Sequence, residues 1–226
     1  NSDELQDGIL IHSSVYSTSF FARIGTQIST NKLYIYHRNS SVNNEMVSNG
    51  TYNENSWNHV VLTIGAGTLK IYINGVLDSK TISYNSSNSY YSANRVWQIG
   101  HISGQNNYHQ FKGDIDELSL WNKVLTANEV TALYNSSVAL DVLSNWGNYS
   151  SSANLKGYWK MEEGTGTTLT DLSGYGNNGA ISGATWATGK KSSSYTNTAK
   201  NISAPTMTIT ATDGSSAISD GATTND

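Results

Sequence analysis

Residues 69–77 read LKIYINGVL and carry the clearest structural signal in the chain. Leu69, Ile71 and Ile73 are separated by single, more polar residues, which is the period of a strand that buries one face. The Asn-Gly pair that follows tolerates the positive φ angles of a two-residue hairpin turn, and the alternation resumes behind it. We therefore predict two antiparallel strands joined by this turn.

The same alternation recurs from residue 8 to about residue 121, for example at residues 33–36 (LYIY) and 59–64 (HVVLTI). Clusters of Asn, Gly and Ser separate these short stretches, as turns separate the strands of a sheet. The pattern predicts an all-β fold.

One stretch, TANEVTALY, has a helical pattern. Thr126 and Glu129 have the spacing of a capping box at its start. Val130, Leu133 and Tyr134 share one face of the helix that would follow. We predict a short helix that packs against the β-structure.

The composition excludes several classes of protein. Only 13% of the 226 residues are charged and the net charge is -4, so the chain lacks the basic surface that binds nucleic acid. It has no apolar run of the roughly 20 residues needed for membrane insertion. It also has no cysteine, which excludes disulfides and thiol chemistry. The surface rich in Ser, Thr, Asn and Gly favours an extracellular or cell-surface location.

Three stretches in order resemble the laminin-G-like and pentraxin-like domains of the concanavalin A-like lectin/glucanase superfamily. They are residues 57–61 (WNHVV), 69–75 (LKIYING) and 111–122 (FKGDIDELSLWN), and the capped helix follows them. The resemblance covers roughly residues 8–137. It implies a two-sheet antiparallel jelly-roll sandwich with one short helix, of the kind found in large bacterial surface proteins.

The opening segment of this family is missing before residue 1, and a good match to it comes late, from GYWKMEEGTGTT at residues 157–168 through Asp171 to Trp186. Residues 155–186 either complete the sandwich, as in a circular permutation, or begin a truncated second copy. We favour the first interpretation, because a linker follows Trp186 in place of the strands that a second copy would need, and because chain ends commonly lie close together.

The predicted organisation is therefore a sandwich over residues 1–188, a linker over 189–204, and the start of a further, Ig-like β domain over 205–226. The chain starts with Asn1 and ends in a Thr/Asn/Asp run, so we expect it to be an internal piece of a larger protein.

The superfamily includes glycoside hydrolases, which need two carboxylates placed across the glycosidic bond. The only candidate is Asp114-Ile115-Asp116-Glu117. Alternation predicts that Asp114, Asp116 and Leu118 share one face of a strand, so a third carboxylate of the hydrolase pattern is missing at the next position on that face. We expect Asp116 and Glu117 to orient the end of the strand, and we predict that the chain is not an enzyme.

Pentraxins hold calcium in an acidic loop just before the strand that resembles residues 111–121. The corresponding loop here, residues 101–110 (HISGQNNYHQ), has no carboxylate. Asp171, Asn177 and Asn178 form a second candidate calcium site, because they offer carboxylate and amide oxygens. The alternative is that Asp171 caps a turn whose glycines adopt positive φ.

Tyr90, Tyr91, Tyr108 and His109 are candidate ligand-binding residues in loops near one end of the sandwich. A tyrosine combines a flat apolar face with a polar tip, which suits stacking against a sugar ring. We expect a non-catalytic recognition or adhesion module that binds a glycan or another extracellular protein. The alternative is a structural spacer in a repeat-containing surface protein.

Overall fold

The computed structural model divides the chain into two compact units, Asn1–Lys190 and Lys191–Asp226. The residues that the structure describes all belong to the first unit; they are 8–14, 21–39, 42–83, 96–100, 111–135 and 140–189. Nearly all of the predicted linker and the whole predicted Ig-like segment lie outside these ranges. The proposed domain boundaries stay predictions.

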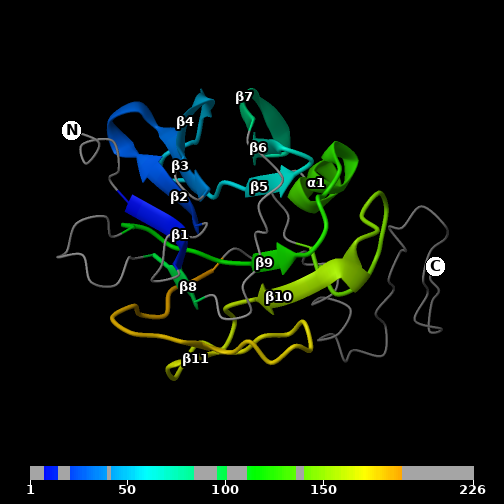
Figure 1. Ribbon diagram of the computed structural model, residues 1–226. Helices are drawn as coiled ribbons and strands as arrows, with labels where there is room; N and C mark the ends of the chain where they lie inside the picture. Colours follow the sequence, from blue (N-terminus) through cyan, green and yellow to red (C-terminus); the bar gives the residue numbers. More distant parts are fainter. Residues whose placement is uncertain are drawn as a thin grey trace, which may run out of the picture. The chain divides into compact units, whose positions relative to one another are not determined.

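A five-stranded antiparallel sheet has the strand order β4-β3-β2-β1-β8 (Figure 1). These strands lie in the region from residue 8 to residue 121 where the sequence predicts short strands. A short 3-10 turn, η2, at Ile28–Thr30 links two of them. The strands are β1 Gly8–Ser14, β2 Phe21–Gln27, β3 Lys32–Asn39, β4 Val42–Thr51 and β8 Val96–Ile99.

A three-stranded antiparallel sheet consists of β5 (Val60–Gly65), β6 (Thr68–Ile73) and β7 (Val76–Ser83). β6 and β7 form the predicted hairpin, with Ile73 opposite Val76. The two turn residues have positive φ, 51° at Asn74 and 79° at Gly75. This prediction is confirmed, because the Asn-Gly pair adopts the conformation that the turn requires.

One core cluster joins these two sheets. Alternate residues of β6 pack with alternate residues of β3 and with one residue of β4, so each sheet buries one face. The buried members of this cluster are Leu33, Ile35, Met46, Leu69, Ile71 and Ile73. The expected all-β sandwich is confirmed in the described part of the chain.

The single α-helix of the described residues, α1 (Ala127–Tyr134), lies over the other face of the three-stranded sheet, where Tyr72 of β6 is buried. The predicted capping box at Thr126 and Glu129 is present. No helix among the described residues is long and apolar enough to span a bilayer.

The late part of the chain contains η4 (Ser152–Asn154), β10 (Leu155–Trp159), β11 (Thr168–Leu169) and β12 (Gly179–Ala180). β10 pairs antiparallel with β9 (Leu118–Trp121), beside which it lies in Figure 1.

Buried residues of this late part share a second core cluster with α1 and β6. Its members are Tyr72, Leu125, Val130, Leu133, Val142, Tyr149, Leu155 and Tyr158. Residues 142–158 therefore make an apolar contact with β6 and α1.

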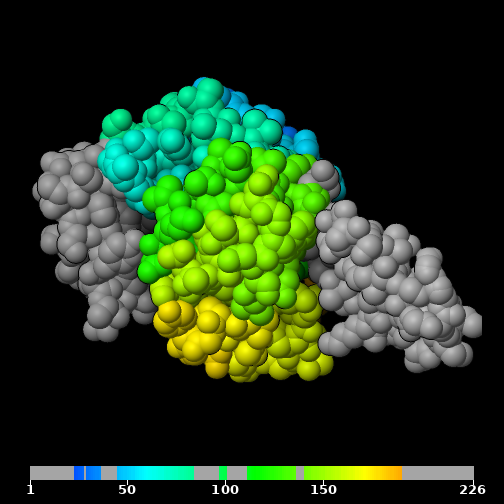
Figure 2. Space-filling model, turned by 90° about the vertical axis from the view of Figure 1, so that its right-hand side faces the viewer, coloured from blue at the N-terminus to red at the C-terminus, as the bar shows by residue number. Residues whose placement is uncertain are grey.

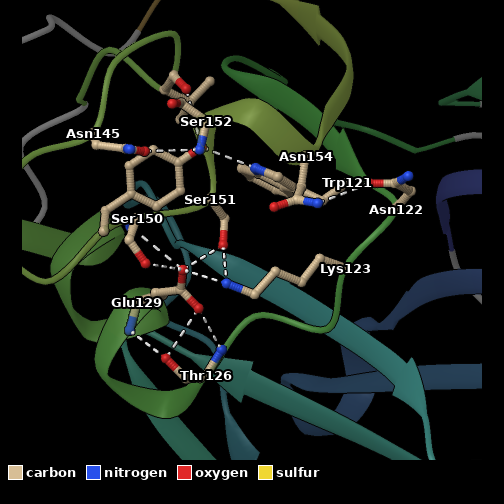
Figure 3. A network of polar contacts seen from close by, with 12 residues as sticks. Trp121, Asn122, Lys123, Thr126, Glu129, Asn145, Ser150, Ser151, Ser152 and Asn154 are labelled. Atoms are coloured by element: carbon tan, nitrogen blue, oxygen red, sulfur yellow. Dashed lines mark hydrogen bonds and ion pairs between the residues drawn. The ribbon is translucent and has the colours of Figure 1, made fainter.

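A buried carboxylate adds a polar contact between α1 and the late part (Figure 3). Glu129 is only 2% exposed. Its Oε2 accepts hydrogen bonds from the N–H (2.9 Å) and hydroxyl (3.0 Å) of Thr126. Its Oε1 accepts from Lys123 Nζ (3.2 Å) and from the hydroxyls of Ser150 (3.2 Å) and Ser151. Both carboxylate oxygens of Glu129 therefore accept hydrogen bonds, as a buried charged group requires.

One strand is shorter than the alternation predicted. Residues 114–117 are not a strand, and β9 begins only at Leu118. Glu117 has a φ of 56°, in the left-handed region, which breaks the extended backbone. The prediction that Asp114 and Asp116 share a strand face with Leu118 was therefore wrong.

Candidate functional site

A glycine-rich loop between β11 and β12 is organised by Asp171, which is 8% exposed. Asp171 Oδ1 accepts hydrogen bonds from the backbone N–H groups of Tyr158 (3.0 Å) and Ser173 (2.9 Å). Its Oδ2 accepts from the N–H of Asn177 at 2.8 Å. The single carboxylate thus ties both arms of the loop to β10.

Burial of Asp171 by itself would raise the pKa of the carboxyl group. Hydrogen bonds from Ser173, Tyr158 and Asn177 outweigh burial and hold the pKa below its usual value. The group is therefore a carboxylate at neutral pH, and it stabilises the loop as an acceptor for backbone donors.

The structure brings together the three residues predicted as calcium ligands. Asn178 Oδ1 accepts from the N–H of Asp171 at 2.9 Å. The side-chain amide of Asn177 donates to the carbonyl of Lys156 (3.0 Å), and the backbone carbonyl of Asn177 accepts from Trp159 Nε1 (3.0 Å). Asn177 thus joins the loop to β10, whereas the hydrogen bond of Asn178 lies within the loop.

The carboxylate at the centre of this candidate calcium site already accepts backbone hydrogen bonds. Calcium binds six to eight oxygens, whereas both oxygens of Asp171 face backbone N–H groups. Within the described ranges, no three His, Cys, Asp or Glu side chains lie together as a possible metal site. Calcium binding at Asp171, Asn177 and Asn178 stays a prediction, and the hydrogen bonds favour the turn-capping role.

At the tip of the loop, Tyr175 is 57% exposed. Gly174 and Gly176 flank it with φ of 88° and 74°, so the backbone turns sharply on both sides of the ring. Lys156 of β10 places its Nζ 4.2 Å from the ring centroid and donates a hydrogen bond to the Tyr175 hydroxyl. This cation–π contact holds the ring while more than half of the surface of the residue stays exposed.

Exposed aromatic rings held in a fixed position are suited to stacking on sugar rings. Figure 2 shows the yellow part of the chain, which includes this loop, at the surface along the lower edge of that view. Leu172, 41% exposed, adds apolar surface in the same loop.

The sequence predicted Asp171, Asn177 and Asn178 in this loop but not Tyr175 or Lys156. The available signal was an aromatic residue between two glycines, in Gly174-Tyr175-Gly176. The other predicted ligand-binding residues, Tyr90, Tyr91, Tyr108 and His109, lie outside the described residues, so their role stays a prediction.

The sequence pattern of the concanavalin A-like lectin/glucanases superfamily matches residues 1–131, which is more than half of the chain. A search of curated proteins found no sequence match.

Among solved structures, the chain is similar to a protein of Bacteroides ovatus ATCC 8483 named as a candidate carbohydrate binding protein. The TM-score is 0.54 at 18% identity, over 81% of this chain and 52% of that one. The chain thus spans about half the length of that protein, and the likeness concerns the fold.

A second similar structure is residues 221–444 of an S-layer domain-containing protein from Clostridium thermocellum ATCC 27405. It is 19% identical over 57% of this chain and 64% of that one, with a TM-score of 0.27, too low to support an argument. The sequence match and the antiparallel sandwich lead to one conclusion: the chain belongs to the concanavalin A-like lectin/glucanases superfamily.

Proposed function

We propose that this chain is a non-catalytic glycan-recognition module of a secreted or cell-surface protein, and that the loop of residues 171–179 binds the sugar. The observation that carries the proposal is the exposed ring of Tyr175, supported by Lys156 and presented by a loop that Asp171 fixes. A preorganised aromatic ring loses little conformational freedom when a ligand binds, which favours affinity.

The lectin-like fold and the composition support the same proposal. The superfamily contains lectins as well as glucanases. The chain is poor in charged residues and rich in hydroxyl and amide side chains, the groups that hydrogen-bond sugar hydroxyls. An extracellular location would place such a module where glycans occur.

The positions of Asp116 and Glu117 support a non-catalytic role. Asp116 Oδ1 accepts a hydrogen bond from the N–H of Glu117 at 3.0 Å. Glu117 Oε2 accepts from the Tyr158 hydroxyl at 2.5 Å. Each carboxylate therefore has a partner within the fold, as a structural role at the start of β9 requires.

A glycan array probed with the whole chain tests the proposal. We expect binding that Tyr175→Ala weakens by about tenfold or more, the loss of roughly 1.4 kcal/mol of contact. Tyr175→Phe should keep most of the binding, because the ring remains.

Trp146→Ala is the matched control, since Trp146 is 46% exposed in a different loop. Equal binding by Tyr175→Ala and the unsubstituted chain would refute the proposed site. Absence of binding to every glycan would instead favour a structural spacer.

A further inference from the structure

The pairing of β10 with β9 contains one irregularity, and it falls at Lys156. Leu155 and Gly157 lie opposite two adjacent residues of β9, so Lys156 is an extra residue in this pairing. A bulge of this kind interrupts the regular ladder and turns the side chain of the extra residue in a new direction. Lys156 is partly exposed, so its side chain can reach both the loop of residues 171–179 and the solvent.

The bulged residue contacts this loop through its backbone and through its side chain. The carbonyl of Lys156 accepts a hydrogen bond from the side-chain amide of Asn177 at 3.0 Å. Its Nζ donates to the hydroxyl of Tyr175 and lies 4.2 Å from the centroid of that ring. The irregular backbone thus places a positive charge beside the exposed aromatic ring.

This positive charge has no ion-pair partner within the part of the chain that the structure describes. Two ion pairs occur there, and neither includes Lys156. Two carboxylates of the segment after β10 are engaged elsewhere. Glu162 pairs with Lys160 at 2.8 Å, and both oxygens of Asp171 accept backbone hydrogen bonds. A negative group from outside the chain would therefore meet a cation that no described carboxylate neutralises.

The hydrogen bond between Lys156 and Tyr175 leaves donors for such a group. An ammonium group has three N–H donors, and the Tyr175 hydroxyl accepts from one of them. Because this hydroxyl oxygen acts as the acceptor, its own O–H can donate to another atom. The two groups lie within hydrogen-bonding distance of each other, so both can donate to the oxygens of one carboxylate or sulfate. Hydrogen bonds between charged groups are stronger than those between neutral groups.

We propose that Lys156 and the Tyr175 hydroxyl form an anion subsite, and that the loop of residues 171–179 recognises acidic glycans. The sugar that stacks on Tyr175 carries a carboxylate or a sulfate ester, which pairs with the Lys156 ammonium group. Lys156 thereby determines specificity, because a neutral sugar gains the stacking contact alone. This inference rests on the glycan-binding function proposed above and narrows it to one class of sugar.

An array of matched glycan pairs, probed with the whole chain, tests the subsite. Each uronate-bearing glycan is printed beside its carboxyl-reduced form, and each sulfated glycan beside its desulfated form. The readout is the ratio of affinities within a pair, so a general weakening of the site affects both members and cancels. We expect the acidic member to bind about fivefold more tightly, as one exposed charge pair allows. The pairs with the largest ratio identify the preferred anion.

Salt and substitutions at Lys156 test whether the preference comes from this charge. The ratio should fall toward one between about 50 mM and about 500 mM NaCl, because salt screens exposed charges. Lys156→Met keeps a long side chain beside the ring but removes the charge, so it should bind both members of a pair equally. Lys156→Arg should keep the preference. Lys80→Met removes the same charge from an exposed position in β7 and is the matched control, which should also keep the preference.

The outcomes separate this inference from the function on which it rests. Equal binding of acidic and neutral members by the unsubstituted chain would overturn the anion subsite and leave the glycan site at Tyr175 in place. A preference that persists in Lys156→Met, or that Lys80→Met also abolishes, would overturn it as well. Binding to no member of any pair would overturn both proposals together.

Discussion

Replacing the buried carboxylate of Glu129 by an amide should destabilise the fold strongly. Burial by itself would raise the pKa of Glu129, but hydrogen bonds from Ser151, Thr126 and Lys123 outweigh it and lower the pKa from 4.5 to about 2. Each tenfold difference in proton affinity corresponds to about 1.4 kcal/mol, so this lowering stabilises the folded chain by roughly 3 kcal/mol at neutral pH.

The pH dependence follows from the sign of this shift. Between pH 4.5 and 2 the unfolded chain binds a proton at Glu129 that the folded chain does not. The stabilisation is therefore complete above pH 4.5 and is lost as the pH falls toward 2. In Glu129→Gln this part of the acid sensitivity should be absent.

Urea unfolding of the unsubstituted chain and of Glu129→Gln, each at pH 7 and pH 3, measures the effect. At pH 7 the variant should lose about 3 kcal/mol of unfolding free energy, because its amide N–H would face the donors of Lys123 and Thr126. The difference in unfolding free energy between the two chains should be smaller at pH 3. Glu163→Gln, at an exposed position, is the control. Equal stabilities at pH 7, or a gap that does not change with pH, would refute the reasoning.

Three further predictions concern stability. Burial lowers the pKa of His59 from 6.5 to about 4. The folded chain should therefore lose roughly 3 kcal/mol of unfolding free energy as the pH falls from 6.5 to 4, because the unfolded chain then binds a proton that the folded chain does not. His59→Phe can keep the ring contact with Tyr134 but cannot bind a proton, so urea unfolding of this variant should show no such loss of stability. The same loss in the variant would contradict the prediction. Gly75→Ala should lower the thermal midpoint more than Gly183→Ala. Both glycines have a φ of 79°, but only a Cβ at Gly75 would lie close to Tyr134, at 2.8 Å. Equal decreases of the midpoint would contradict the effect of that contact. The midpoint should be the same in calcium and in chelator, and a rise with calcium that Asp171→Ala abolishes would establish the predicted calcium site.

Local signals made part of the fold predictable. The Asn-Gly turn and the Thr126–Glu129 capping box each depend on residues that are close in sequence, and both are present. The start of β9 was not predictable from alternation, because the left-handed conformation of Glu117 accompanies a contact with Tyr158, 41 residues away.

As with the fold, only those features of the candidate site that depend on nearby residues could be predicted. Asp171 was predicted as a calcium ligand, with a turn cap as the alternative; the hydrogen bonds favour the alternative, which depends on local geometry alone. The pairing of Tyr175 with Lys156 spans 19 residues and depends on how the loop folds back on β10. Spacing in the sequence carries no signal for such a contact.

An NMR titration of the chain with an oligosaccharide bound on the array tests the proposed glycan site most directly. Backbone amides and the ring of Tyr175 report on the loop, while Tyr90, Tyr91, Tyr108 and His109 report on the other predicted ligand-binding residues. We predict that the largest shifts fall on Tyr175 and its two flanking glycines. Shifts concentrated on the other four residues, with Tyr175 unperturbed, would contradict the proposed site.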